Sequence, residues 1–247
     1  MESTFRLEGQ GSIGTGFIIG RPFLGEPTKA RYTLVTASHV LEKTKGELIT
    51  IHLRVKNSAN QWQRLPVSLK IREGEHALWL KHPDVDCAAM YIGLPQGVFD
   101  VLLPAALLAD DETLRKFEIH PGDELNCLGY PFGAESNEIG FPILRSGKIA
   151  SYPILPTKHV KTFLFDFEVF PGNSGGPVYF IDSTRVYGGG TNVGLIQFII
   201  GLVSQERLVS EQIEELYGRR EQRYPLALGE VVHASLIRET IDLLPVP

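Results

Sequence analysis

The sequence predicts an all-β protein that ends in a helix. Its 247 residues include 25 glycines and 16 prolines with short apolar runs between them, a composition that favours strands and turns over long helices. Apolar and polar residues alternate over 49–55 and again over 67–71, which is the period of half-buried strands. Chains of this length bury a substantial core, and all-β barrels of this size often form one structural unit.

Strand-like runs follow one another through the first part of the chain, where we place a first lobe at 1–100. The run at 11–20, GSIGTGFIIG, is punctuated by glycines, as in a strand that packs closely against other backbone. RYTLVT at 31–36 and the nearly unbroken apolar run at 86–92 predict two further strands.

The strand rhythm is lost at 101–120, which predicts a connection between two lobes. Strand-like runs then resume in a second lobe, which we place at 121–234. Within it, apolar residues recur at helical spacing over 206–224 in a charged background, which predicts a helical insertion. A last strand precedes a terminal helix at 235–247, whose apolar residues share one stripe.

The charge and composition of the chain exclude several kinds of partner. It carries 24 basic and 29 acidic residues, a net charge of −5, and no dense basic run of the kind that binds nucleic acid. No apolar run is long enough to span a membrane, and no cluster of metal ligands or phosphate-binding loop is evident. We therefore expect no nucleic-acid or membrane partner, no metal site and no cofactor.

Two features indicate a cytoplasmic protein. Residues 1–14 have neither the basic region nor the apolar region of a secretory signal. The two cysteines, Cys87 and Cys127, each lie in an apolar strand-like segment. We expect them to be buried free thiols, as is usual in a reducing compartment.

The stretch PGNSGGPV at 171–178 has the composition of a tight turn that presents a nucleophilic serine, Ser174. A serine hydroxyl is a poor nucleophile at neutral pH unless it has an adjacent base and donors for the oxyanion that forms. Without a Cβ, Gly172 is free to adopt a positive φ and to turn its N–H toward the same point as the N–H of Ser174. An ordinary turn between strands prefers the same residue types, so other parts of the chain must decide.

His39 and Asp86 are the partners that Ser174 would need. His39 follows small residues at the end of an apolar strand, whereas surface or packing roles suffice for the other six histidines. The base needs a carboxylate that fixes its tautomer and stabilises its charged form. Asp84 and Asp86 both lie near the right place, and we favour Asp86 because it directly precedes an apolar strand while Asp84 lies in a polar loop.

Three motifs, in the order histidine, aspartate, serine, resemble those of the trypsin-like (chymotrypsin-fold) serine proteases. TASHV at 36–40 resembles the family's TAAHV, DCAAM at 86–90 resembles its aspartate followed by an apolar segment, and PGNSGGPV resembles its GDSGGPV. Further similarity at GTGFIIG, LGYPFG and GLVS extends the match to nearly the whole chain.

The resemblance implies a fold and an activity. The fold would be two packed six-stranded antiparallel β-barrels with a cleft between them. The activity would be that of a serine endopeptidase acting on protein or peptide substrates. His39, Asp86 and Ser174 would form the catalytic triad, and the N–H groups of Gly172 and Ser174 would form the oxyanion hole.

Asn173 separates this chain from the secreted, zymogen-activated members, which have an aspartate before the serine. A neutral Asn173 cannot form an ion pair with a newly cut N-terminus, so we expect no activation by that route. The motif is closer to bacterial and HtrA-type members, although no residues remain for the PDZ domain that HtrA-like proteins usually add. The paired cysteines that staple the secreted enzymes are also missing.

The resemblance also indicates substrate-binding residues. Glu168 lies six residues before Ser174, near the base of the family's primary specificity pocket, which implies a preference for Arg or Lys before the cut. The alternative is that Glu168 is simply a polar position on an alternating strand. Val203, Ser204 and Gln205 resemble the segment that pairs with the substrate backbone by β-addition.

The predicted helix at 206–224 follows this segment and would border the cleft. It would gate access of the substrate or receive a regulatory protein partner. The alternative is a helix that covers the edge of a barrel.

Two other functions compete with an active endopeptidase. A catalytically latent or inactive module of the same fold would use its cleft to bind peptides, although it would have no need of an intact His39, Asp86 and Ser174. An esterase of the α/β-hydrolase class would use the Gly-x-Ser-x-Gly spacing at 172–176. That class also requires the order serine, acid, histidine and a helix after the serine, which this sequence does not show.

Overall fold

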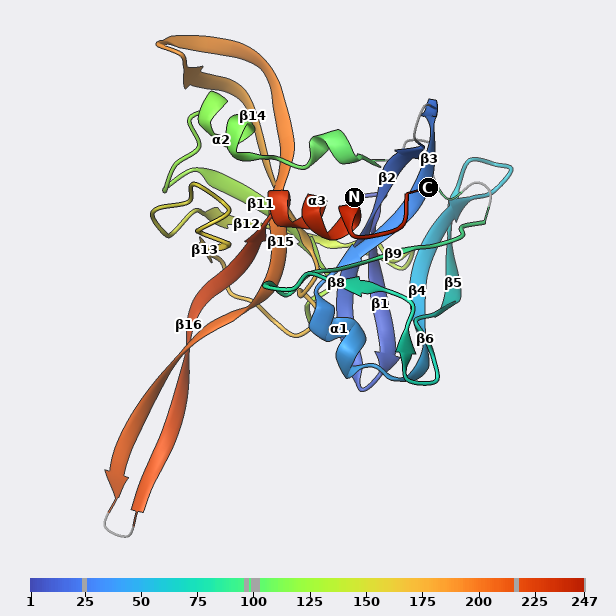
Figure 1. The fold of residues 1–247 in the computed structure, drawn as a ribbon, viewed down its shortest axis with the longest axis horizontal. Helices are drawn as coiled ribbons and strands as arrows, with labels where there is room; N and C mark the ends of the chain where they lie inside the picture. The colour runs from blue at the N-terminus through green and yellow to red at the C-terminus, as the bar shows by residue number, and fades with distance from the viewer. Residues whose placement is uncertain (24–25, 96–97, 99–102, 216–217, 247) are drawn as a thin grey trace.

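Two β-sheets that pack against one another form most of the molecule (Figure 1). The computed structural model describes residues 1–23, 26–95, 98, 103–215 and 218–246. The prediction of an all-β fold with a C-terminal helix is confirmed. The lobe boundaries at 100, 120 and 234 stay predictions.

The first sheet has eight described strands in the order β5-β4-β1-β2-β3-β9-β8, with β10 beside β2. The resemblance implies six strands, and the difference lies in very short segments: β8 and β10 comprise two residues each, too few for alternation to reveal them. A hairpin of β6 and β7 links β5 to β8. The elements up to β10 are β1 Thr4–Gln10, β2 Ser12–Phe23, β3 Glu26–Thr36, α1 Ser38–Lys43, β4 Lys45–Lys56, β5 Trp62–Lys70, β6 Arg72–Glu73, β7 His76–Ala77, β8 Leu80–Lys81, β9 Ala88–Tyr91 and β10 Leu103–Pro104.

The second sheet has six described strands in the order β12-β11-β14-β15-β16-β13. Its two ends meet through a bridge between Ile149 and Phe165, and Ala150 N–H donates to the carbonyl of Leu164 at 2.8 Å. The sheet therefore closes on itself, which protects its edges. The remaining elements are η1 Ala105–Leu107, α2 Asp111–Lys116, β11 Glu124–Gly129, η2 Pro131–Gly133, β12 Ile143–Lys148, β13 Thr162–Asp166, β14 Pro177–Tyr187, β15 Gly190–Glu215, β16 Gly218–His233 and α3 Ala234–Asp242.

The alternation seen in the sequence sets which side chains enter the cores. In β4, Ile49, Ile51 and Leu53 are at most 1% exposed, and they face the core of the first sheet. In β13, Phe163 and Phe165 are buried in the same way in the core of the second sheet. Successive side chains of a strand point to opposite faces, so the period of two fixes the buried face of each strand.

The C-terminal helix α3 belongs to the core of the first sheet although it follows the last strand of the second. Leu236, Ile237 and Ile241 are almost fully buried among first-sheet side chains. Burial of one such side chain stabilises a fold by about 1.5–3 kcal/mol. Arg21 of β2 donates to the carbonyl of Leu244 at 2.9 Å just after the helix. The end of the chain thus holds the two sheets together.

The prediction of a helix at 206–224 is wrong. This segment belongs to a long antiparallel hairpin of β15 and β16 that extends away from both sheets (Figure 1). Leu208 pairs with Pro225 and Val209 with Tyr224, and Leu208 and Tyr224 are 45% and 40% exposed. The two strands continue from the sheet and satisfy each other's backbone groups, which outweighs the helical spacing of the apolar residues. Two of those residues, Leu216 and Tyr217, lie outside the described part of the chain.

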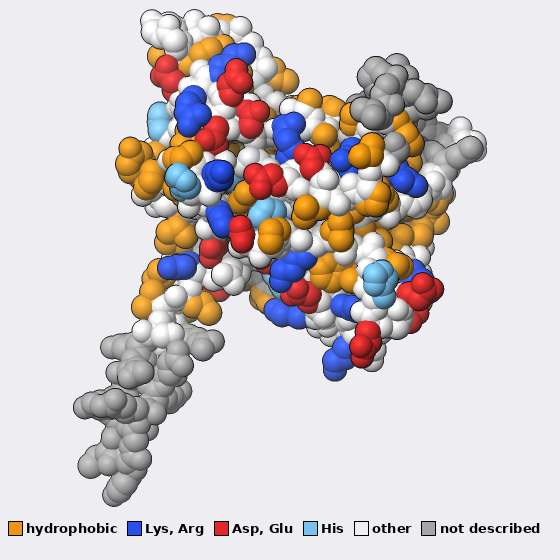
Figure 2. Space-filling model, viewed as in Figure 1, with side chains coloured by type: hydrophobic (Ala, Val, Ile, Leu, Met, Phe, Trp, Pro, Cys, Tyr) orange, Lys and Arg blue, Asp and Glu red, His pale blue; other side chains and the backbone are white. Residues whose placement is uncertain are grey.

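The surface carries mixed charge. On the face shown in Figure 2, basic and acidic side chains are interspersed. Among the described helices, none combines the length and the apolar character that crossing a membrane requires.

Candidate active site

The turn that carries Ser174 leaves the second sheet after β13 and returns to it as β14. Gly172 has a φ of +98°, and a Cβ there would come 2.1 Å from the carbonyl oxygen of Tyr130. Gly175 has a φ of +86°, and a Cβ there would come 2.1 Å from the carbonyl oxygen of Thr15. Only glycine fits these two positions, so the backbone geometry itself requires the glycines of the motif.

The backbone N–H groups of this turn divide into two sets. Those of Asn173, Gly175 and Gly176 each donate to a carbonyl at 2.7–2.9 Å. Those of Gly172 and Ser174 have no acceptor among the described residues. Because backbone N–H groups in a folded protein are almost always paired, two free donors beside a serine are available to a ligand.

Asn173 stabilises the turn from inside. Its side chain is 1% exposed, and its Oδ1 accepts the N–H of Phe170 at 2.9 Å. A Cβ on Gly129 would come 2.6 Å from Asn173 Nδ2, so the amide packs directly against β11. A neutral hydrogen bond therefore closes the turn at this position.

Strand pairing brings His39 and Asp86 together. β3 and β9 are antiparallel neighbours in which Thr36 lies opposite Ala88, so the end of one strand meets the start of the other. His39 follows β3 and Asp86 precedes β9. His39 Nδ1 lies 2.6 Å from Asp86 Oδ2, and the two side chains are 26% and 25% exposed.

Three further groups hold the carboxylate of Asp86. Its Oδ1 accepts the hydroxyl of Ser38 at 2.7 Å and the N–H of His39 at 3.0 Å, and its Oδ2 accepts the hydroxyl of Ser204 at 2.8 Å. Burial by itself would raise the pKa of Asp86, but these hydrogen bonds and the neighbouring His39 outweigh it and hold the pKa well below its usual range. Asp84, the alternative carboxylate, instead pairs with Lys161 at 2.7 Å.

His39 and Ser174 line one cleft with a volume of about 540 Å³. Among the described residues, no hydrogen bond joins Ser174 Oγ to His39 Nε2. The walls combine apolar side chains with charged and polar ones. Besides His39 and Ser174, the lining residues are Gly11, Ser12, Ile13, Lys43, Val169, Phe170, Pro171, Gly172, Gln205, Glu206 and Leu208.

The structure brings only part of the predicted substrate-binding set to this cleft. Gln205 lines it, with its amide nitrogen 3.1 Å from a carboxylate oxygen of Glu230. Glu168 does not line it and has an exposed side chain in the segment between β13 and the Ser174 turn. Val203 is buried, and its backbone groups pair with the Ser174 turn, while Ser204 holds Asp86.

Two residues at the site were missed by sequence reasoning. Ser38 stands directly before His39 in the TASHV motif, and its hydroxyl binds Asp86. A closer look at that motif could have identified it. Thr15 of β2 donates its hydroxyl to the carbonyl of Gly172 at 2.6 Å, and no local pattern marks it for this contact.

The chain aligns with two solved protein structures. The chain aligns with the protease Anisep from Arthrobacter nicotinovorans at 15% identity and a TM-score of 0.52, over 98% of this chain and 95% of that chain. It aligns with an inactive mutant form of Rv3671c from M. tuberculosis H37Rv at 17% identity and a TM-score of 0.48, over 98% of this chain and 86% of that chain. At 15% identity, the likeness to Anisep shows the fold alone. No curated protein matches this chain.

A family model described as a trypsin-like peptidase domain matches residues 14–188. The matched segment is more than half of the 247 residues and contains His39, Asp86 and Ser174. The chain belongs to the family of trypsin-like peptidase domains.

Proposed function

We propose that the protein is a serine endopeptidase that hydrolyses peptide bonds at Ser174. The observation that carries this proposal is the pair of free N–H groups beside Ser174, in a cleft shared with an imidazole that a carboxylate holds. Peptide hydrolysis by a serine needs these parts together: a nucleophile, an oriented base and donors for the oxyanion.

In the proposed reaction, Ser174 Oγ attacks the substrate carbonyl carbon while His39 Nε2 takes the hydroxyl proton. The carbonyl oxygen becomes an oxyanion and accepts the N–H groups of Gly172 and Ser174. When the C–N bond breaks, His39 gives the proton to the departing amine. The acyl part of the substrate stays bound to Ser174 as an ester. A water molecule, deprotonated by His39, then attacks this ester, releasing the new carboxylic acid and restoring the serine.

Asp86 positions the base throughout this cycle. It accepts a hydrogen bond from the Nδ1–H of His39, which leaves Nε2 free to act as the base, and its charge stabilises the imidazolium that forms. Its lowered pKa keeps it ionised at neutral pH. The Ser174–His39 hydrogen bond would form with substrate present, since catalytic hydrogen bonds of free enzymes often tighten only in the complex.

Labelling by a fluorophosphonate probe tests the proposal. We expect covalent labelling of the wild type and digestion of fluorescein-labelled casein, with both lost in Ser174→Ala. A circular-dichroism spectrum shows that the variant is folded. A folded wild type that the probe does not label under any condition would reject catalysis and favour the alternative, a peptide-binding module of the same fold.

We further propose that the β15–β16 hairpin regulates access to the cleft, in place of the helix expected from the sequence. Gln205, Glu206 and Leu208, at the base of this hairpin, line the cleft, so movement of the hairpin would change its walls. Leu208 and Val209 expose apolar surface to a regulatory protein partner. The gating role is tested by the activity of a variant with a shortened hairpin.

A cytoplasmic location is also part of the proposal. Cys87 and Cys127 are free and buried, and burial raises the pKa of each thiol to about 12. Free structural thiols fit a reducing compartment. Detection of the protein only in the membrane or extracellular fraction of its cells would reject this location.

A further inference from the structure

We propose that Arg6 is a positioning residue for the N–H of Gly172, acting across the two sheets through the loop at 130–141. The inference rests on the proposed function, because it concerns the support of one of the two proposed oxyanion donors. The loop connects β11 to β12 and packs against the Ser174 turn.

The first link is the hydrogen bond from Phe132 N–H to the carbonyl of Pro171, at 2.6 Å. The peptide between Pro171 and Gly172 is trans, so its C=O and its N–H point in opposite directions. With the oxygen of Pro171 held on the side of Phe132, the N–H of Gly172 points away from the loop. This is one of the two N–H groups beside Ser174 that have no acceptor in the described part of the chain.

Phe132 holds this position in an unfavourable backbone conformation. Its φ of 51° and ψ of 25° lie in the left-handed region, which is unfavourable for a bulky side chain. The side chain is 69% exposed, and its ring centroid lies 5.3 Å from that of Phe170, so burial of Phe132 itself contributes little support. Other groups must stabilise the conformation.

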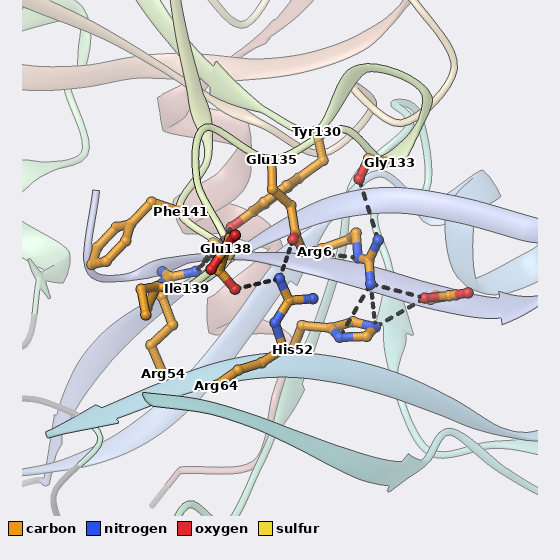
Figure 3. Close-up of polar contacts among 12 residues, drawn as sticks. Arg6, His52, Arg54, Arg64, Tyr130, Gly133, Glu135, Glu138, Ile139 and Phe141 are labelled. Carbon is orange, nitrogen blue, oxygen red and sulfur yellow. Dashed lines mark hydrogen bonds and ion pairs between the residues drawn. The ribbon is translucent and has the colours of Figure 1, made fainter. Parts of the chain in front are cut away.

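Arg6 of β1 supplies that support at the neighbouring residue. Its Nη1 donates to the carbonyl of Gly133 at 3.2 Å, and its Nε lies 3.5 Å from Oε1 of Glu135 (Figure 3). Its Nη2 lies 3.3 Å from Glu8 and also contacts the ring of His52, which orients the guanidinium. Because Gly133 directly follows Phe132, a fixed Gly133 carbonyl restrains the left-handed turn.

Two more arginines hold the far part of the loop. Arg54 of β4 donates to the carbonyl of Gly140 at 2.6 Å, and Arg64 of β5 donates to the carbonyl of Glu138 at 2.9 Å. β5, β4 and β1 are neighbours in the first sheet, and Figure 3 shows their arginines pointing toward the same loop. The first sheet therefore sets the shape of a second-sheet loop that holds the Pro171–Gly172 peptide.

Arg6 is the contact that an experiment can remove. Arg54 is 1% exposed and also binds the carbonyl of Thr4, so its loss would disturb the fold itself. The Arg6 side chain is 17% exposed. Arg21 of β2 is a matched control: its side chain is 14% exposed, it binds main-chain carbonyls and it forms one ion pair, but it contacts the C-terminal segment.

The test separates the maximal rate of fluorophosphonate labelling from the affinity for the probe. We expect Arg6→Gln to lower the maximal rate by about 10-fold or more, less than the ~10²–10³ that loss of a complete oxyanion donor costs. The half-saturating probe concentration should stay unchanged, because ground-state contacts remain. Arg6→Lys, which keeps one donor, should recover part of the rate, and Arg21→Gln should label at the wild-type maximal rate.

A folded Arg6→Gln that labels at the wild-type maximal rate overturns the inference while the proposed function stands. If Arg6→Gln does not fold, Arg6→Lys is measured in its place, and a wild-type maximal rate there also overturns the inference. A wild type that does not label overturns the proposed function, and the inference with it.

Discussion

Thr15 donates its hydroxyl to the carbonyl of Gly172 at 2.6 Å, from the first sheet to the turn of the second. Its N–H donates to the carbonyl of Ser174 at 2.9 Å, and its own carbonyl accepts the hydroxyl of Thr36 at 2.7 Å. The side chain of Thr15 is fully buried. One residue of β2 thus holds both proposed oxyanion positions, so the turn depends on how the two sheets pack.

Thr15→Val should lower both stability and activity. The valine keeps the shape but leaves the carbonyl of Gly172 without this donor, which costs about 1–3 kcal/mol of unfolding free energy. The maximal labelling rate should fall as well, because the turn loses a restraint. Thr33→Val is the control: Thr33 is equally buried and its hydroxyl has no hydrogen-bond partner among the residues that the structure describes, so urea unfolding should show no loss of stability. Equal stability and rates in both variants would contradict the role of Thr15.

Asp86→Asn should lower the labelling rate by about 10⁴-fold, because an amide cannot hold the tautomer of His39 that accepts the serine proton. Asp84→Asn is the matched control two residues away, since Asp84 pairs with Lys161 outside the cleft. Rates are compared at neutral pH on folded protein. A rate for Asp86→Asn close to that of Asp84→Asn would exclude the proposed role.

His233 should make the fold less stable as the pH falls. Burial lowers the pKa of its imidazole from 6.5 to about 4, although Asp111 partly opposes the change. Between these pH values the unfolded chain binds a proton that the folded chain does not, so stability declines as the pH decreases. At 1.36 kcal/mol per pH unit, the loss amounts to about 3 kcal/mol.

Urea unfolding at pH 7 and pH 4 measures this loss. His233→Leu, which cannot bind a proton, should lose less stability than the wild type over that range. Equal losses in the two proteins would show that other groups are responsible.

Shortening the hairpin should leave the fold intact. Leu208 pairs with Pro225, so an Asn-Gly turn can replace 209–224 and close the strands at that pair. The removed part extends away from both sheets, and we expect an unchanged Tm. If the hairpin restricts access to the cleft, kcat/KM for small peptides should rise. Wild-type kinetics in the folded variant would reject gating.

The sequence predicted β4 correctly and the segment at 206–224 incorrectly, and each outcome has a physical reason. Alternation identified β4 and its buried residues, because a period of two is a local property. The same reasoning failed at 206–224, where apolar residues recur at helical spacing but belong to two strands that pair with each other. Backbone pairing between segments on either side of a turn overrides the preference of either segment alone.

Residues close together in the chain were sufficient to identify the proposed nucleophile. The backbone of the PGNSGG turn requires glycine at positions 172 and 175. The TASHV motif and the aspartate before β9 are also short segments that can be recognised without reference to distant residues. The residues that support the turn could be found only from the packing of the two sheets. Thr15 lies 157 positions from Gly172, and Arg6 lies 127 positions from Gly133. Contacts at such separations leave no periodic trace in the sequence, because they form only where two folded sheets meet.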